Sequence, residues 1–360
     1  MFEMAEKFHS LLPEIRYPII QAPMAGTATP ELVAAVSNAG AMGSLGIGFS
    51  SPEKAREMIE QTRTLTDKPF NANVFCHQSA PRDLESEKLW LNHLDALFSE
   101  FGAEPPVAID EVGISFRDSD DMLQVLLETR PAVVSFHFGL PQPHQLNALR
   151  DAGIFLFATA TNLEDAKALV TAGVDAIVAQ GIEAGGHRGL FDPDQDDQRL
   201  STTVLVRLLT QHLQVPVIAA GGIMDGYGVR AMLDIGAVAA QMGTAFILCP
   251  ETAANDGYRN ALKSERTQST RLTKVLTGRP ARGMTNRYID HSEQPGSPQP
   301  PAYPLATDAA RKLAALAEAV GDFAFTAHWA GQGAPLAREM SASGLVSTLV
   351  EEMNSSRNAR

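Results

Sequence analysis

The sequence predicts an α/β fold, namely a TIM-type (β/α)8 barrel with an insertion after its third strand and a small C-terminal cap domain. Eight short apolar runs recur through the first 250 residues and are nearly continuous in apolar character, as expected of strands buried on both faces of a parallel sheet. Amphipathic segments separate most of these runs, and such alternation builds right-handed βαβ units. Eight units favour a closed barrel, while a doubly wound open sheet is the competing interpretation.

The predicted strands and helix starts follow in order along the chain. Thr29-Pro30-Glu31 combines an N-cap residue, a first-turn proline and an acidic first turn, and Ser51-Pro52-Glu53 repeats this pattern. A later helix is expected over Leu163–Thr171, where Gly173 suits a C-terminal cap. The eight strands are expected at Ile19–Gln21, Ala41–Leu45, Asn71–Phe75, Ala132–Phe138, Ile154–Ala160, Ala176–Gln180, Val215–Ala220 and Ala237–Met242.

The length of the chain and the spacing of the predicted strands indicate three regions. A typical barrel needs roughly 250 residues, and the chain has 360. We therefore expect the barrel in residues 1–250, a cap over its opening in 251–317, and C-terminal helices that pack back on the barrel in 318–360. The regular alternation of strands and helices is also interrupted between the third and fourth strands, where His77–Arg130 contains two helical patterns. We expect this stretch to be an insertion at the C-terminal ends of the strands.

Composition limits the classes of partner. The formal net charge is -13 at pH 7, which disfavours nucleic acid and anionic membrane surfaces. Cys76 and Cys249 form no C-x-x-C pair, and the histidines show no metal-ligand spacing, so no metal is expected. The first residues lack the apolar stretch of a signal peptide, and the apolar runs end well before the roughly 18 residues of a membrane span. These features predict a cytoplasmic protein that could form a homodimer.

The most informative segment, Gln180–Gly189, directly follows the sixth predicted strand. Loops after the strands form the active sites of barrels, and the paired Gly185 and Gly186 permit close approach of the backbone to a ligand. His187 then lies in a loop, where it can donate or accept a proton near neutral pH. The segment predicts a catalytic histidine, and a glycine-rich connection with a surface histidine is the alternative.

Two further glycine turns predict a phosphate site. Gly221-Gly222 follows the seventh predicted strand, and Gly243-Thr244 follows the eighth. Such turns expose backbone N–H groups that bind phosphate with help from the helix dipole, and these two loops are the usual phosphate site of barrels. Ordinary turns are the alternative interpretation.

Four residues on other strands are candidates for the same site. Pro23 and Met24 follow the first strand and could lay main chain against a flat ring. Asn73 is an amide within an apolar strand and needs a partner, which a ring with donors and acceptors or the backbone would supply. His137 ends the fourth strand, where it faces the opening beside His187 or is a satisfied core histidine. The sequence contains neither a P-loop nor a Rossmann fingerprint.

These segments resemble the nitronate monooxygenase (2-nitropropane dioxygenase) family, and the match is closest to its bacterial class I. The resemblance spans nearly the whole chain, including Phe136–Gly139 and His328–Gly333, and is most specific over Gly181–Gly189. It implies an FMN-binding barrel that oxidises alkyl nitronates, with propionate 3-nitronate as the expected substrate, and uses O2 to give a carbonyl compound and nitrite. The matching catalytic residue is His187. FMN contacts are implied at Ala22, Pro23, Met24, Asn73, Gln180, Gly185, Gly186, Gly221, Gly222, Gln241, Met242, Gly243 and Thr244.

The resemblance also implies a substrate pocket with some departures. Tyr258 and Tyr303 match tyrosines that line the pocket of class I enzymes. Relatives carry a further tyrosine and a lysine where this chain has Thr307 and Arg311, and an aromatic residue is missing at Gly113-Ile114. These changes leave the choice of substrate open.

The expected roles and the alternatives follow from these residues. Arg311 or a cap tyrosine would position a substrate carboxylate, and His137 would stand beside the substrate. His187 would hydrogen-bond the nitro oxygens, attract an anionic nitronate when protonated, and remove the α-proton of a neutral nitroalkane. The alternatives are an FMN-dependent NAD(P)H:quinone or enoyl reductase on the same barrel and a flavin-free barrel that binds a phosphate ligand.

Overall fold

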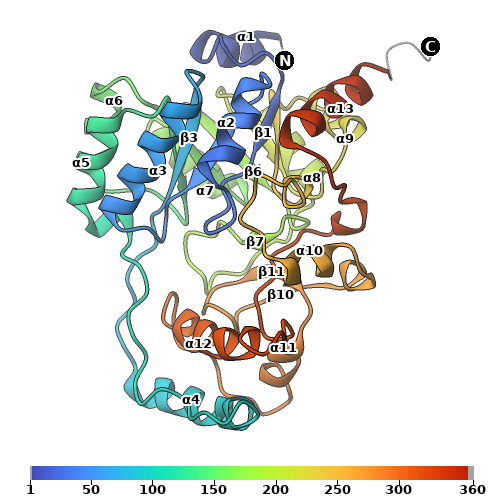
Figure 1. Ribbon diagram of the computed structural model, residues 1–360. Coiled ribbons are helices and arrows are strands. Elements are labelled where there is room, and N and C mark those ends of the chain that lie inside the picture. The colour runs from blue at the N-terminus through green and yellow to red at the C-terminus, as the bar shows by residue number, and fades with distance from the viewer. Residues whose placement is uncertain (1, 356–360) are drawn as a thin grey trace.

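The computed structural model describes residues 2–355 and shows a barrel joined to a smaller lobe (Figure 1). Eight strands form the barrel: β1 Ile19–Gln21, β2 Gly43–Gly46, β3 Phe70–Phe75, β4 Val133–His137, β5 Phe155–Ala160, β6 Ala176–Gln180, β8 Val217–Ala220 and β9 Ala239–Met242. They pair in parallel in the order β1-β9-β8-β6-β5-β4-β3-β2. A bridge between Ile20 and Met42 closes the ring. This closure confirms the predicted barrel over the open sheet.

Eight helices surround the barrel: α2 Pro30–Asn38, α3 Pro52–Leu65, α5 Asp120–Thr129, α6 Pro143–Asp151, α7 Leu163–Thr171, α8 Thr202–His212, α9 Gly226–Asp234 and α13 Ala342–Ser355. The predicted caps are confirmed, because the Thr29 hydroxyl accepts from the N–H of Leu32 at 3.1 Å and the Ser51 hydroxyl from that of Lys54 at 3.3 Å. Gly173 leaves α7 with a φ of +86°, the left-handed conformation typical of a helix end.

The two ends of the barrel are covered differently. Helix α1 (Phe2–Leu11) closes the N-terminal end of the strands, where Phe8 and Leu12 share an apolar cluster with Phe157. Helix α13, the last helix within residues 2–355, packs against α9 and α2. The C-terminal ends of the strands face the smaller lobe, so ligand access is from that side (Figure 1).

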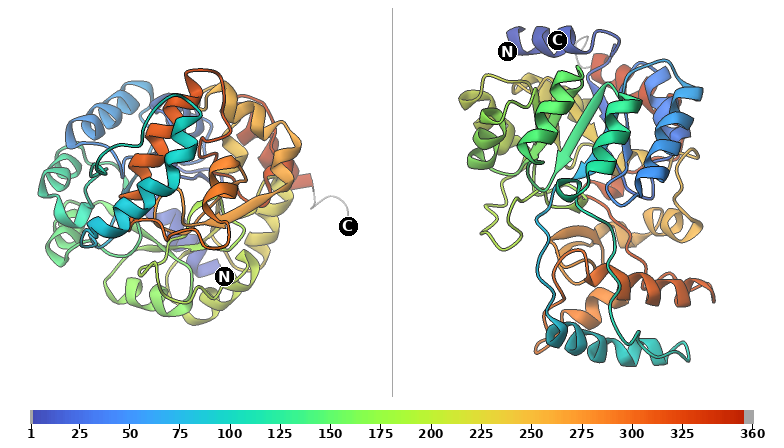
Figure 2. Two further views of the ribbon diagram at one scale, coloured as in Figure 1. Left: turned by 90° about the horizontal axis from the view of Figure 1, so that it is seen from below. Right: turned by 90° about the vertical axis from the view of Figure 1, so that its left-hand side faces the viewer.

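The lobe is built from two separate stretches of the chain. Its core joins Trp90 and Leu94 to Tyr288, Leu313 and Phe325. Figure 2, seen from below, shows that α4 and α12 cross the barrel opening, and extended segments connect α4 to the barrel. The sequence indicated an insertion before Arg130 but not that its helix packs on residues about 200 positions later. The lobe elements are α4 Leu84–Ser99, α10 Asp256–Leu262, β10 Thr270–Thr273, β11 Ala281–Met284, α11 Arg287–Ser292 and α12 Ala306–Glu318.

Two general features of residues 2–355 bear on function. Within that range no helix combines the length and apolar character needed to cross a membrane. Nor does the same range contain a group of three or more His, Cys, Asp or Glu side chains suited to hold a metal ion. Both cysteines are buried and free.

Candidate active site

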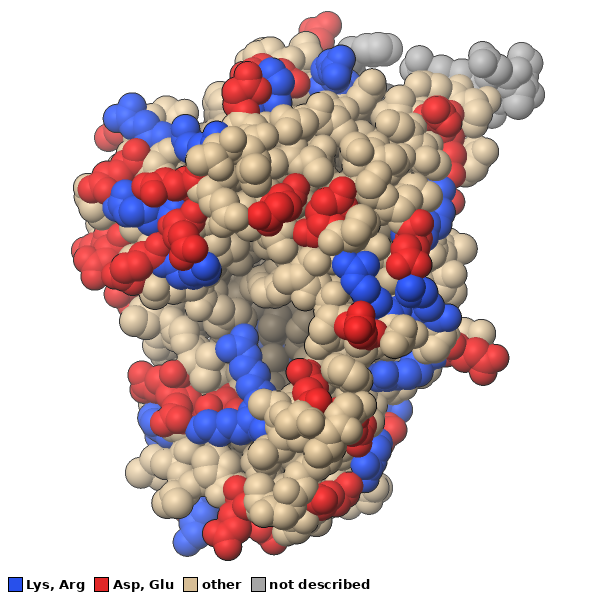
Figure 3. Space-filling view, viewed as in Figure 1, with Lys and Arg blue, Asp and Glu red and all other residues tan. Residues whose placement is uncertain are grey.

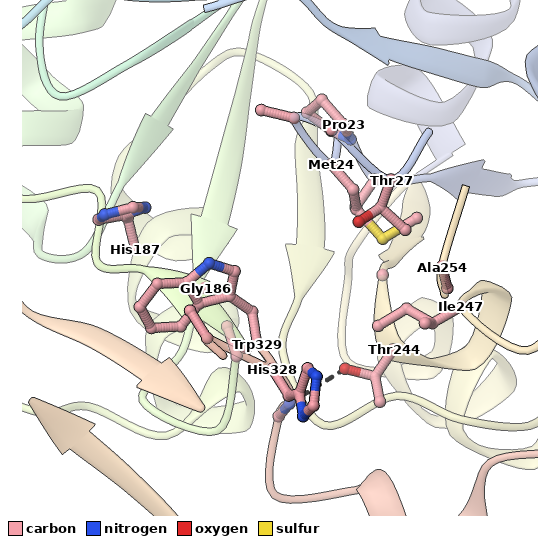
Figure 4. Close-up of a pocket in the computed structure, with 18 of the residues that line it drawn as sticks. Pro23, Met24, Thr27, Gly186, His187, Thr244, Ile247, Ala254, His328 and Trp329 are labelled. Atoms are coloured by element: carbon pink, nitrogen blue, oxygen red, sulfur yellow. Dashed lines mark hydrogen bonds between the residues drawn. The ribbon is translucent and has the colours of Figure 1, made fainter. Parts of the chain in front are cut away.

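A cavity of about 560 Å³ lies between the barrel and the lobe. The space-filling view shows the hollow that leads into it, with basic side chains at its lower edge (Figure 3). In the close-up, Met24 and Thr27 lie on one side of the pocket and His328 and Trp329 on the opposite side, with His187 at one end (Figure 4). All thirteen residues expected to contact FMN line this cavity, together with His137, His187, Tyr258, Thr307 and Arg311. Tyr303 is the one candidate outside this lining.

Four glycines, Gly185, Gly221, Gly222 and Gly243, form a glycine cradle on the cavity wall. Gly221 and Gly222 have φ values of +125° and +71°, which glycine adopts without strain. Within residues 2–355, the backbone N–H groups of Gly221, Gly222 and Gly243 have no hydrogen-bond partner. Free N–H groups gathered on one wall suit an anion such as phosphate.

The loop that carries His187 is held from both sides. Residues Gly186–His187 form the short strand β7, which pairs antiparallel with β11 of the lobe. From the barrel side, the Gln180 amide donates to the His187 carbonyl at 2.9 Å and accepts from the Gly189 N–H at 2.8 Å. Buried Arg188 completes the attachment through an ion pair with Asp197 at 2.8 Å. Gln180 therefore fixes the position of His187 from the end of β6.

The His187 ring is neutral at pH 7. Burial, reinforced by the nearby His137, Arg279 and His77, lowers the pKa of His187 to about 3. At pH 7 His187 therefore carries no charge with which to attract an anionic nitronate. The sequence could not reveal this, because the burial depends on lobe residues that are distant along the chain.

The tautomer of His187 follows from its contact with Thr277. The His187 Nε2 lies 3.0 Å from the Thr277 hydroxyl, and that hydroxyl lies 3.2 Å from the Arg279 carbonyl. When Thr277 donates to the carbonyl, its oxygen accepts from the imidazole, so Nε2 carries the proton. Nδ1 has no partner among the described residues. It is therefore a lone pair open to the cavity, as a proton acceptor requires.

His137 serves the site indirectly. Its Nε2 lies 3.0 Å from the His187 carbonyl and its Nδ1 lies 3.1 Å from the Thr159 hydroxyl. Burial lowers the pKa of His137 to about 4, so the ring is neutral and donates through Nε2. The Nε2 holds the His187 backbone and the Nδ1 is bonded to Thr159, which leaves neither nitrogen for a proton transfer.

Asn73 has the partner that the sequence analysis required. Its amide nitrogen donates to the Ser135 hydroxyl at 2.8 Å and to the Ser135 carbonyl at 3.1 Å. The amide oxygen has no partner among the described residues. Because Asn73 lines the cavity, that oxygen is available as an acceptor for a ligand.

The remaining candidates differ in what they offer to a ligand. The Tyr258 hydroxyl donates to the Trp329 carbonyl, and the Tyr258 ring stacks on His328 at 4.8 Å. Tyr303 is buried 5.5 Å from the His187 ring, and its hydroxyl has no partner. Arg311 is exposed on the cavity wall with its guanidinium 5.3 Å from the Phe49 ring centre, which leaves its donors free for an anion.

Sequence reasoning missed two residues next to His187. Thr277 orients the imidazole, and Arg279 lies in the same turn between β10 and β11. Gly278 between them has a φ of +89°, and a Cβ there would lie 2.3 Å from the Pro301 carbonyl oxygen. The only sequence signal was a glycine between two polar residues in a segment without strand or helix periodicity.

Buried neutral histidines make stability depend on pH. Burial lowers the pKa of His77, His137 and His328 to about 4, and that of His187 to about 3. As the pH falls below the ordinary histidine value of about 6.5, the unfolded chain binds protons that the folded chain does not, so stability decreases. Each histidine contributes about 1.4 kcal/mol per pH unit until the folded pKa is reached.

Urea unfolding at about pH 7 and about pH 5.5 measures this dependence. We expect His137→Gln to reduce the slope of stability against pH, whereas His9→Gln, at an exposed position, leaves it unchanged. Equal slopes in both variants would show that His137 is not held neutral.

The fold and the site together define a class of protein. A closed barrel with a glycine cradle, an acceptor amide and an unprotonated imidazole around one cavity is typical of barrel enzymes that bind a phosphorylated cofactor. Within this class the chain belongs to the nitronate monooxygenase family, whose model matches residues 6–352. This is a family of flavin-dependent oxidoreductases.

Individual relatives cover almost the whole chain. The nitronate monooxygenase of Pseudomonas aeruginosa is 53% identical over 350 residues, which are 97% of this chain and 99% of that protein. The nitronate monooxygenase of Paraburkholderia phytofirmans is 53% identical over 94% of this chain and 93% of its own length. Among solved structures, nitroalkane oxidase from Streptomyces ansochromogenes has a TM-score of 0.86 and 36% identity over 98% of this chain and 99% of its own.

Proposed function

We propose that this chain is an FMN-dependent enzyme that oxidises alkyl nitronates with O2 and releases nitrite and a carbonyl compound. Two relatives at 53% identity are named nitronate monooxygenases, and each spans more than nine-tenths of this chain. The observation that carries the proposal is the open Nδ1 of a neutral His187 on the wall of the cavity that also contains the glycine cradle.

The residues present fit FMN. The free N–H groups of the glycine cradle suit the phosphate, and the open amide oxygen of Asn73 suits a ring N–H. At Gly186 a Cβ would meet nothing within 4 Å, so the backbone there borders open space that a ring could fill. FMN, when bound, supplies the electron acceptor that the oxidation needs.

The chain's own groups supply binding and proton transfer. The Nδ1 lone pair of His187 would take the α-proton of a neutral nitroalkane, so that the C–H bond breaks and the nitronate forms beside the imidazole. A nitronate that arrives already ionised needs no such step. Arg311, which lines the cavity, would pair with a substrate carboxylate, which favours propionate 3-nitronate over simple alkyl nitronates.

A second candidate function is an NAD(P)H-dependent enoyl or quinone reductase. The observation that favours it is the likeness to FabK from Thermotoga maritima, which has a TM-score of 0.75 and 28% identity over 98% of this chain and 97% of its own. Its lower similarity, compared with nitroalkane oxidase, ranks it second.

Two measurements on the purified protein test the proposal. We expect a yellow protein that releases nitrite from propionate 3-nitronate in air, and whose flavin is not bleached by NADH without oxygen. Rapid bleaching by NADH without nitrite release would favour the reductase. A colourless protein that does not bind added FMN would favour a flavin-free barrel that binds another phosphate ligand.

A further inference from the structure

Arg279 is a buried cation behind the wall that carries His187. Only 2% of its surface is exposed, and it does not line the cavity. Its Nη2 donates to the carbonyls of Leu190 at 3.0 Å and Phe191 at 2.8 Å. Burial lowers the pKa of Arg279 to about 10, so the guanidinium remains charged at pH 7.

This charge has no counter-ion in contact. Among the described residues no carboxylate lies within 4.0 Å of Arg279, and its Nε has no hydrogen-bond partner. Arg188, which is equally buried, differs because it pairs with Asp197 at 2.8 Å. Asp192 and Asp194 attract the guanidinium only from beyond contact distance. A buried charge without a contacting carboxylate is costly to stability, so a folded protein that keeps one gains something else from it.

An aromatic layer lies between this charge and the site. The Arg279 guanidinium lies 4.3 Å from the Phe138 ring centre and 5.8 Å from that of Tyr303. Those two rings lie 5.6 and 5.5 Å from the His187 ring. Phe138 and Tyr303 are both buried, and charges act over longer distances in buried surroundings than in solvent.

Arg279 differs from the other cations near His187, because Arg188 is paired with Asp197 and Arg311 is exposed to the cavity. His187, His137 and His77 are all neutral, because burial lowers the pKa of each well below 6.5, and Arg279 lowers all three further. Arg311 is exposed on α12, from which it also acts on Tyr303. An anion that binds beside His187 would therefore meet the field of a buried guanidinium that no contacting carboxylate neutralises.

We propose that Arg279 is a positioning residue whose buried charge makes the cavity beside His187 select the anionic nitronate over the neutral nitroalkane. Arg279 acts through the field behind the Phe138 and Tyr303 rings and touches neither substrate nor cofactor. This inference rests on the proposed nitronate chemistry, because it concerns the charge of that substrate.

Two unreactive probes of equal shape measure this selection without turnover. Isobutyrate has the planar, two-oxygen anion of a simple alkyl nitronate, and isobutyramide is its neutral counterpart. Calorimetry on the purified wild-type protein should show tighter binding of isobutyrate. In R279Q we expect the Kd of isobutyrate to rise at least about tenfold, while that of isobutyramide changes less than about twofold.

Two further variants separate charge from structure. R279K keeps the positive charge but lacks the planar guanidinium group, so this variant should retain most of the preference for the anion. R282Q is the matched control, because Arg282 is buried but points to the Ile182 carbonyl and Thr270, away from the aromatic layer. It should leave the ratio of the two Kd values unchanged.

Several results would overturn the inference. They are equal binding of both probes by the wild type, an equal loss for both in R279Q, or a loss of the preference in R279K as complete as in R279Q. If R279Q does not fold, a complete loss of the preference in R279K, or equal binding of both probes by the wild type, still overturns the inference. Nitrite release by the wild type tests the proposed function separately, since neither probe is oxidised.

Discussion

Replacing Gly185 by alanine is expected to abolish retention of the flavin. A Cβ at this position would lie 2.5 Å from the Gly331 nitrogen and 2.6 Å from the Ala330 carbonyl carbon. Both are backbone atoms and cannot rotate away as a flexible side chain would. The two segments must separate, which costs about 1–3 kcal/mol as overpacking does. Separation also disrupts the bond from the Gly331 N–H to the Thr244 hydroxyl, 3.0 Å long, at the cavity wall.

The measurement is the ratio of flavin to protein absorbance after gel filtration, with thermal unfolding recorded in parallel. We expect at least a tenfold loss of bound flavin, equivalent to about 1.4 kcal/mol of binding free energy. The matched control is Gly344→Ala on α13, where the nearest atom to the new Cβ is the flexible Ser341 hydroxyl at 3.0 Å. Full flavin retention in Gly185→Ala would mean that this contact does not shape the site.

The barrel was predictable because its strands are buried on both faces. Such strands read as continuous apolar runs, and β1 and β6 begin and end at the residues predicted. Helix α7 also has its predicted bounds, because Asn162 accepts from the Asp165 N–H at one end and Gly173 stops the helix at the other. Local sequence patterns were therefore enough to predict the bounds of these elements. Once the strands were predicted, the candidate site could be assigned to the loops that follow them.

The lobe and the charge of the site were not predictable in the same way. Helix α4 packs on α12 through Trp90 and Leu313, and no local pattern encodes a contact between such distant segments. The protonation of His187 depends on burial by β11 and on Arg279, both almost a hundred residues later. From the sequence, a histidine in a glycine-rich loop is expected to have an ordinary pKa. Only the folded surroundings, which bury the ring, show that its pKa is lowered.

Changing His187 to asparagine is expected to separate the two forms of substrate. A neutral nitroalkane must lose its α-proton to Nδ1, whereas a nitronate arrives without that proton. General-base catalysis contributes about 100- to 10,000-fold, so we expect kcat/KM for neutral nitroethane to fall at least about 100-fold. The value for ethylnitronate should fall less than about tenfold, because its reaction needs no proton transfer to His187. Bound flavin should be unchanged.

The pH profile provides an independent check on the same residue. The pKa of His187 is lowered to about 3 by burial and by its cationic and histidine neighbours. The base form therefore persists as the pH falls, and kcat/KM for the neutral nitroalkane should stay level from about pH 8 to about pH 5. A decline with an apparent pKa near 6.5 would show that solvent reaches the imidazole. Thr277→Val, which removes the group that orients Nε2, should lower the rate while keeping the level profile.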